Sequence, residues 1–181
     1  MKALKKLIAL FLVLSISILS GILIYNEKGT RVQGNASDDV VVILDAGHGG
    51  FDGGAVAEDG TAEKDINLNI SMSVAEMLNS CGYEVILTRN DDSGTEEDQS
   101  ASIAKRKVSD LNNRLKLINS YENAIFVSVH LNKFTTSTAN GAQVFYSANN
   151  AESKIIADSI QGSIKADIQN DNKRKTKKSG K

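Results

Sequence analysis

Two histidines and a glutamate stand where predicted strands and a helix begin or end. His48 follows an apolar run at residues 40–45, and His130 ends a second run, AIFVSVH. These are the two histidines of the sequence, and Glu63 opens the helical pattern between them. Two imidazoles and one carboxylate form a ligand set for a tetrahedral zinc ion whose fourth position is kept for water. The residue types therefore indicate a catalytic zinc site.

Spacing alone leaves the carboxylate ligand open. An acid in the first turn of a helix, such as Glu63, is stabilised by the helix dipole without any metal. Five other acids lie nearby: Asp45, Asp52, Glu58, Asp59 and Asp65. Of these, Asp45 is close enough to His48 to accept a hydrogen bond that fixes a ring tautomer, and it could equally cap a turn.

The segment that carries His48 reads GHGGFDGG, and it follows a predicted strand. A dinucleotide-binding loop needs the spacing G-x-G-x-x-G with a helix directly after it. Here the spacing differs and the helical pattern begins only at residue 63. Glycine permits sharp turns and close approach of the backbone to another group. We therefore expect these glycines to bring the main chain close to a ligand.

The elements that must position these residues alternate along the chain. Strands are predicted at residues 40–45, 83–88, 124–130 and 143–146, and helices at residues 63–80, 109–121 and 152–168, with Thr61 as the first N-cap and a loop at 90–102. Such alternation predicts right-handed crossovers and a mainly parallel sheet. Ligands bind outside the carboxyl ends of the strands in such sheets, where both histidines fall. We expect an α/β fold of three layers, a twisted sheet flanked by helices.

The two ends of the chain differ from its middle. Three lysines precede 19 uncharged residues at positions 7–25, which predicts a signal peptide or a hydrophobic signal-anchor helix in residues 1–25. A polar linker follows at 26–39, and the positive-inside rule places the remainder outside the cytoplasm. Residues 40–170 form the expected catalytic domain. Six of the last nine residues are Lys or Arg, so residues 171–181 are expected to be a solvated, disordered basic tail rather than a nucleic-acid site.

Cys81 is the single cysteine of the chain. One cysteine excludes an intramolecular disulfide and a cysteine-based zinc cluster. We expect Cys81 to be a small buried residue at the end of the first helix.

Six stretches occur together in one order: DAGHGGFDGGA, Glu63 at a helix start, LTR at 87–89, the Leu111 to Arg114 pattern, SVHLN at 128–132 and GAQVFY at 141–146. Together they resemble the zinc-dependent N-acetylmuramoyl-L-alanine amidases of bacterial cell walls, over about residues 40–168. The resemblance is strongest to the spore-cortex branch. It implies that His48, Glu63 and His130 are the ligands of one Zn²⁺, with Asn132 as a candidate substrate-binding residue.

The resemblance also implies a reaction and a missing group. Family members hydrolyse the amide between N-acetylmuramic acid and L-alanine in peptidoglycan, assisted by a second glutamate on a late strand. This sequence has no glutamate after Glu152, so no catalytic acid or base is identified. We expect zinc binding with impaired turnover, from a domain that lacks its last strand and helix, or a protein partner that supplies the missing strand.

Two other functions fit part of the pattern. One is a non-catalytic peptidoglycan-binding or regulatory protein that kept the groove and lost the chemistry. The other is a zinc hydrolase of another kind, such as a polysaccharide deacetylase. The ordered LTR, SVHLN and GAQVFY stretches argue against the deacetylase.

Overall fold

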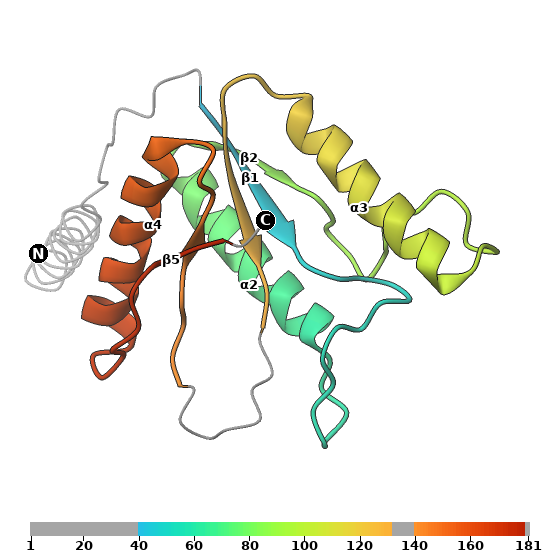
Figure 1. Ribbon diagram of the computed structural model, residues 1–181, viewed down its shortest axis with the longest axis horizontal. Coiled ribbons are helices and arrows are strands. Elements are labelled where there is room, and N and C mark those ends of the chain that lie inside the picture. The colour runs from blue at the N-terminus through green and yellow to red at the C-terminus, as the bar shows by residue number, and fades with distance from the viewer. Residues whose placement is uncertain (1–39, 132–139, 180–181) are drawn as a thin grey trace, which may run out of the picture. The chain divides into compact units, whose positions relative to one another are not determined.

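The computed structural model describes residues 40–131 and 140–179. They divide into two units, one ending at Leu131 and one beginning at Asn132. The first unit alternates strand and helix along the chain (Figure 1): β1 Val41–Ala46, α2 Glu63–Ser80, β2 Glu84–Leu87, α3 Ile103–Asn119 and β3 Ala124–Val129.

The first unit is built on a parallel sheet with strand order β2-β1-β3. The central strand β1 is almost completely buried, with Ile43 and Ala46 at 0% exposure and Leu44 at 2%, which fits its continuous apolar sequence. Asp45 pairs with Ser128 and Ala46 with Val129, so β1 and β3 end side by side. The predicted α/β class, a parallel sheet with flanking helices, is confirmed.

Helix α2 packs on β1 and β2 through a stripe repeated every four residues. Its buried members are Glu63, Asn67, Ser71 and Ala75. Ala75 joins the apolar core with Val42 and Leu44, while the stripe becomes polar toward the start of the helix. Helix α2 therefore presents polar side chains at the edge of the sheet where the strands end.

The predicted N-cap of α2 is wrong. Ala62, not Thr61, is the N-cap of α2, and no side chain caps this helix. The loop carbonyls of Ala55 and Gly53 accept from the N–H groups of Glu63 and Lys64 at 2.8 and 3.2 Å, so no side-chain cap is needed.

Cys81 is exposed rather than buried, because it follows α2 at the surface end of the helix. Helix α3 also differs from its prediction, since it begins at Ile103 rather than at residue 109. The added turns read IAKRKV, whose alanine and cations favour a helix although they weaken the apolar pattern.

The second unit contains β4 Phe145–Tyr146, α4 Ala151–Ser163, a π-helical turn Ile164–Ile168 (η1) and β5 Lys177–Lys178. Helix α4 and η1 together cover the predicted helix at 152–168. Strand β5 pairs in parallel with β4, so residues 171–179 are ordered, although a disordered tail was expected at residues 171–181. Buried Asn172 helps to hold this segment, because its side chain donates to the Ala142 carbonyl at 2.8 Å.

The predicted hydrophobic segment 1–25 and the linker 26–39 lie outside the described residues. Among residues 40–131 and 140–179, no helix is long and apolar enough to cross a membrane. The predicted catalytic domain at 40–170 stays a prediction.

Candidate metal centre

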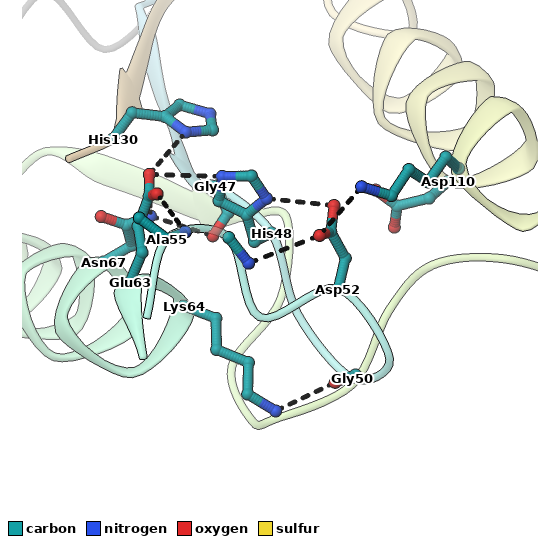
Figure 2. A network of polar contacts seen from close by, with 12 residues as sticks. Gly47, His48, Gly50, Asp52, Ala55, Glu63, Lys64, Asn67, Asp110 and His130 are labelled. Carbon is teal, nitrogen blue, oxygen red and sulfur yellow. Dashed lines mark hydrogen bonds and ion pairs between the residues drawn. The ribbon is translucent and has the colours of Figure 1, made fainter. Parts of the chain in front are cut away.

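His48, Glu63 and His130 meet at the end of the sheet where β1 and β3 stop. Each offers one ligand-type atom, and these three atoms lie within 4.8 Å of one another. Glu63 Oε1 is 3.2 Å from His48 Nε2 and 3.1 Å from His130 Nδ1. Figure 2 shows the Glu63 carboxylate between the two rings. Among the described residues this is the one group of three or more His, Cys, Asp or Glu side chains close enough to share a metal.

Glu63 is fixed by two backbone donors from separate loops. Its Oε2 accepts from the Ala55 N–H at 2.9 Å and its Oε1 from the Leu131 N–H at 2.8 Å. Burial by itself raises the pKa of this carboxyl, but the Ala55, Leu131 and His130 contacts outweigh burial and hold the pKa below its ordinary value. Glu63 is therefore a charged carboxylate held in place before any ligand arrives.

His48 has an uncommon backbone conformation. Its φ is +63°, and it is the one non-glycine residue with positive φ in the described part of the chain. Such a conformation costs about 1 to 3 kcal/mol and persists where the surroundings hold it. Here Arg114 Nη2 donates to the His48 carbonyl at 2.7 Å, and the ring Nδ1 contacts Asp52 Oδ2 at 3.0 Å. These contacts leave Nε2 facing Glu63.

Two buried arginines bind the carbonyl of the last residue of β1 and the carbonyls of the two residues after it. Arg89 Nε donates to Ala46 O at 2.9 Å and Arg89 Nη2 to Gly47 O at 3.2 Å. Arg114 Nη1 donates to Ala46 O at 3.0 Å, while Arg114 Nη2 donates to His48 O. Both guanidinium groups are nearly inaccessible, with Arg89 at 5% exposure and Arg114 at 6%. We call this set of bonds to the carbonyls of residues 46–48 the arginine clamp.

Carboxylates balance the buried charge of Arg114. Its guanidinium forms ion pairs with Asp45 and Asp110. Burial by itself lowers the pKa of Arg114, but these two carboxylates outweigh burial and raise the pKa above its ordinary value. Arg114 therefore stays a cation inside the fold.

Asp45 has a different partner from the one expected. Thr88 Oγ1 and Ser128 Oγ donate to its carboxylate at 2.8 and 2.6 Å, and its third partner is Arg114. The ring of His48 is paired with Asp52 instead, because strand β1 directs Asp45 into the sheet interior, where it is 6% exposed. Asp45 thus acts on His48 only through Arg114.

The glycines around His48 provide room for the histidine rings. A Cβ on Gly47 would lie 2.3 Å from the His130 ring. A Cβ on Gly54, whose φ is +67°, would lie 2.6 Å from His48 Cδ2 and 2.8 Å from Glu63 Oε2. The backbone thus approaches the ligand-type side chains closely, as the glycine-rich sequence predicts.

The three residues fit a zinc ion in their chemistry. Two imidazoles and one charged carboxylate converge from separate elements, which is a common donor set for catalytic zinc. Of the other acids near His48, Asp52 supports its ring, while Asp59 accepts from the Thr61 N–H at 3.0 Å in its own turn. Asn132, the candidate substrate-binding residue, lies outside the described residues.

Sequence reasoning missed the roles of Arg89, Arg114 and Asn67. The two arginines stand in the LTR and Leu111 to Arg114 patterns, yet nothing in those patterns reveals which carbonyls they bind. Asn67 lies one turn after Glu63, is fully buried, and donates to Gly47 O at 3.1 Å. A polar residue at the buried position of an amphipathic helix is the signal that could have found it.

Comparison with known proteins places this chain in a family. The family model described as N-acetylmuramoyl-L-alanine amidase (Amidase_3) matches residues 42–180. The chain belongs to the Amidase_3 family of N-acetylmuramoyl-L-alanine amidases.

Two bacterial amidases are similar to this chain over most of its length. The germination-specific N-acetylmuramoyl-L-alanine amidase of Bacillus subtilis is 37% identical over 130 residues, which is 72% of this chain and 54% of that protein. The chain therefore spans about half the length of this curated relative. The structure of the CwlD amidase from Clostridioides difficile, in complex with the GerS lipoprotein, is similar with a TM-score of 0.73 and 40% identity, over 77% of this chain and 72% of that one.

A more distant relative shares the same fold. The amidase AmiC2 of Nostoc punctiforme is similar with a TM-score of 0.62 and 28% identity, over 78% of this chain and 69% of that one.

The arginine clamp leads to a stability prediction. Arg114→Gln leaves Asp45 and Asp110 without their buried cation, so we expect the free energy of unfolding to fall by about 3 to 5 kcal/mol. Lys116→Gln is the matched control on the same helix, because the Lys116 side chain is 72% exposed and its ion pair is long, at 3.8 Å. Urea denaturation of the full chain, followed by circular dichroism, measures both. Equal stability of the two variants would contradict the clamp.

Proposed function

We propose that the chain binds one zinc ion through His48, Glu63 and His130 and acts as an N-acetylmuramoyl-L-alanine amidase on peptidoglycan. The convergence of these three side chains within 4.8 Å carries the proposal. Membership of the amidase family supports the reaction, the amide bond between N-acetylmuramic acid and L-alanine.

The metal, Glu63 and the neighbouring glycines each contribute something different to the proposed reaction. Zinc supplies Lewis-acid polarisation of the amide carbonyl and lowers the pKa of water. Glu63 contributes the negative charge of the ligand set, and its two backbone donors keep it aimed at the histidines. The glycines at positions 47 and 54 spare the histidine rings the clashes that a Cβ there would cause.

Proton transfer is the step for which the described residues offer least. In the described residues, the acids bonded to the histidines are Glu63, which serves as a ligand, and Asp52, which is engaged with His48 and Lys107. The sequence contains no glutamate after Glu152. General acid-base assistance is worth about 100- to 10,000-fold in rate. We infer that these 181 residues alone bind zinc and cleave their substrate slowly.

The setting of the reaction follows from the relatives. The name of the germination-specific Bacillus subtilis amidase supports spore cortex as one substrate, with vegetative cell wall as the other. Peptidoglycan lies outside the cytoplasm, so we propose an extracytoplasmic protein whose residues 1–25 are a signal anchor or signal peptide. Residues 40–170 form the proposed catalytic domain, with Asn132 contacting substrate. The lipoprotein complex of the Clostridioides difficile relative supports a protein partner for this chain also.

A second candidate function is peptidoglycan binding without turnover. The engagement of both nearby acids favours it, because no described carboxylate next to the histidines is left to move a proton. Such a protein would keep the metal and the groove and would regulate or recruit other wall enzymes.

Metal content tests the ligand set. We expect about one zinc per chain for the purified full chain, and loss of that zinc in His130→Ala and in Glu63→Gln, since each removes one of three protein ligands. Asp65→Asn is the matched control, because Asp65 is an exposed acid in the same helical turn as Glu63. Elemental analysis after dialysis gives the content. Equal zinc in wild type and His130→Ala would exclude the assignment.

Product analysis tests the reaction. Muropeptides or cortex fragments incubated with the zinc-loaded chain should slowly release peptides with a free L-alanine amine. Cleavage should be at least about 100-fold slower than by a relative that has an acid-base glutamate. Release of acetate would instead identify a deacetylase. Binding with no cleavage would select the second candidate, and cleavage as fast as the relative would refute the inferred impairment.

A further inference from the structure

Asp52 lies on the opposite side of the His48 ring from Glu63. Its Oδ2 is 3.0 Å from His48 Nδ1, while His48 Nε2 is 3.2 Å from Glu63 Oε1. Figure 2 shows the ring bridging the two carboxylates. Because an ionised carboxylate only accepts hydrogen bonds, Nδ1 carries the proton and donates to Asp52. Nε2, the nitrogen that faces Glu63, is then the one through which His48 can bind a metal.

The place of Asp52 relative to His48 is set by its own backbone. The N–H of Asp52 donates to Gly49 O and the N–H of Gly49 donates to Asp52 O, both at 3.0 Å. This closed turn begins at the residue directly after His48. The carboxylate of Asp52 therefore approaches the ring from a short, doubly bonded loop.

Helix α3 holds the other side of this carboxylate. Lys107 Nζ is 3.1 Å from Asp52 Oδ1, the oxygen that does not contact His48. Lys107 and Arg114 are seven residues apart on α3, which places them on one face two turns apart. Arg114 binds the His48 carbonyl and Lys107 reaches its ring through Asp52. One helix face thus supports both the backbone and the side chain of His48.

We propose that Asp52 is a positioning residue that fixes the tautomer and ring orientation of His48 for metal binding, with Lys107 holding Asp52 in place. The inference rests on the proposed zinc site. A carboxylate that accepts from the second nitrogen of a metal-binding histidine orients the ring and raises its basicity, and its loss costs 10- to 100-fold in metal affinity in comparable sites.

Zinc affinity of the full chain tests the proposal at fixed pH, by competition with a chromophoric chelator. We expect Asp52→Ala to weaken zinc binding about 10- to 100-fold. Asp52→Asn keeps an acceptor without the charge, so its loss should be smaller, and Lys107→Met should also fall between wild type and Asp52→Ala. Asp59→Asn and Lys105→Met are the matched controls, an exposed acid in the same loop and an exposed lysine on the same helix, and should bind as wild type does.

Nitrogen-15 NMR of labelled histidine in the metal-free chain gives a readout that a general loss of stability does not produce. With only two histidines in the chain, a His48→Gln variant assigns both signals. We expect Nδ1 of His48 to be protonated in wild type and to lose part of this proton occupancy in Asp52→Ala, while the melting temperature of the metal-free chain changes little.

The outcomes separate this inference from the proposed function. If wild type binds no zinc, the proposed function fails, and the proton on Nδ1 of His48 still decides whether Asp52 orients the ring. If wild type binds zinc and Asp52→Ala binds it equally well, or keeps the same protonation of Nδ1 as wild type, the positioning role is overturned.

Discussion

The backbone carbonyls at the end of strand β1 need hydrogen-bond donors, and the rest of the structure depends on how this need is met. The pairing of β1 ends at Leu44 on the β2 side and at Ala46 on the β3 side. The carbonyls of residues 46–48 still lie within the fold, where buried carbonyls need hydrogen-bond donors. The arginine clamp supplies them from Arg89 and Arg114. Because the clamp ends on the His48 carbonyl, it also sustains the left-handed backbone that directs this histidine toward Glu63.

Charge balance ties this clamp to the rest of the first unit. A buried guanidinium is stable only with carboxylates beside it, and Arg114 has one from strand β1, Asp45, and one from its own helix, Asp110. Ser128 on β3 also donates to Asp45. The sheet, helix α3 and the histidine loop are thus joined by one polar network, and the proposed metal centre lies at its edge.

The sequence predicted the positions of the strands better than it predicted the side-chain contacts. The apolar run before His48 and the one that ends at His130 identified two parallel strands, because burial on both faces leaves a clear pattern. The early start of α3 was hidden by its cations, and the N-cap at Ala62 was missed because loop carbonyls do the capping. The pairing of Asp52, rather than Asp45, with His48 depends on a positive φ that no residue pattern reveals. Asn132 stays a prediction.

X-ray absorption at the zinc edge of the zinc-loaded full chain tests the central claim most directly, that His48, Glu63 and His130 are brought together to hold one metal ion. The account predicts a first shell of nitrogen and oxygen at about 2.0 to 2.2 Å with the outer-shell scattering of two imidazoles. A sulfur ligand at about 2.3 Å, or a shell without imidazole scattering, would contradict it. Cys81 is the single cysteine that could supply such a sulfur.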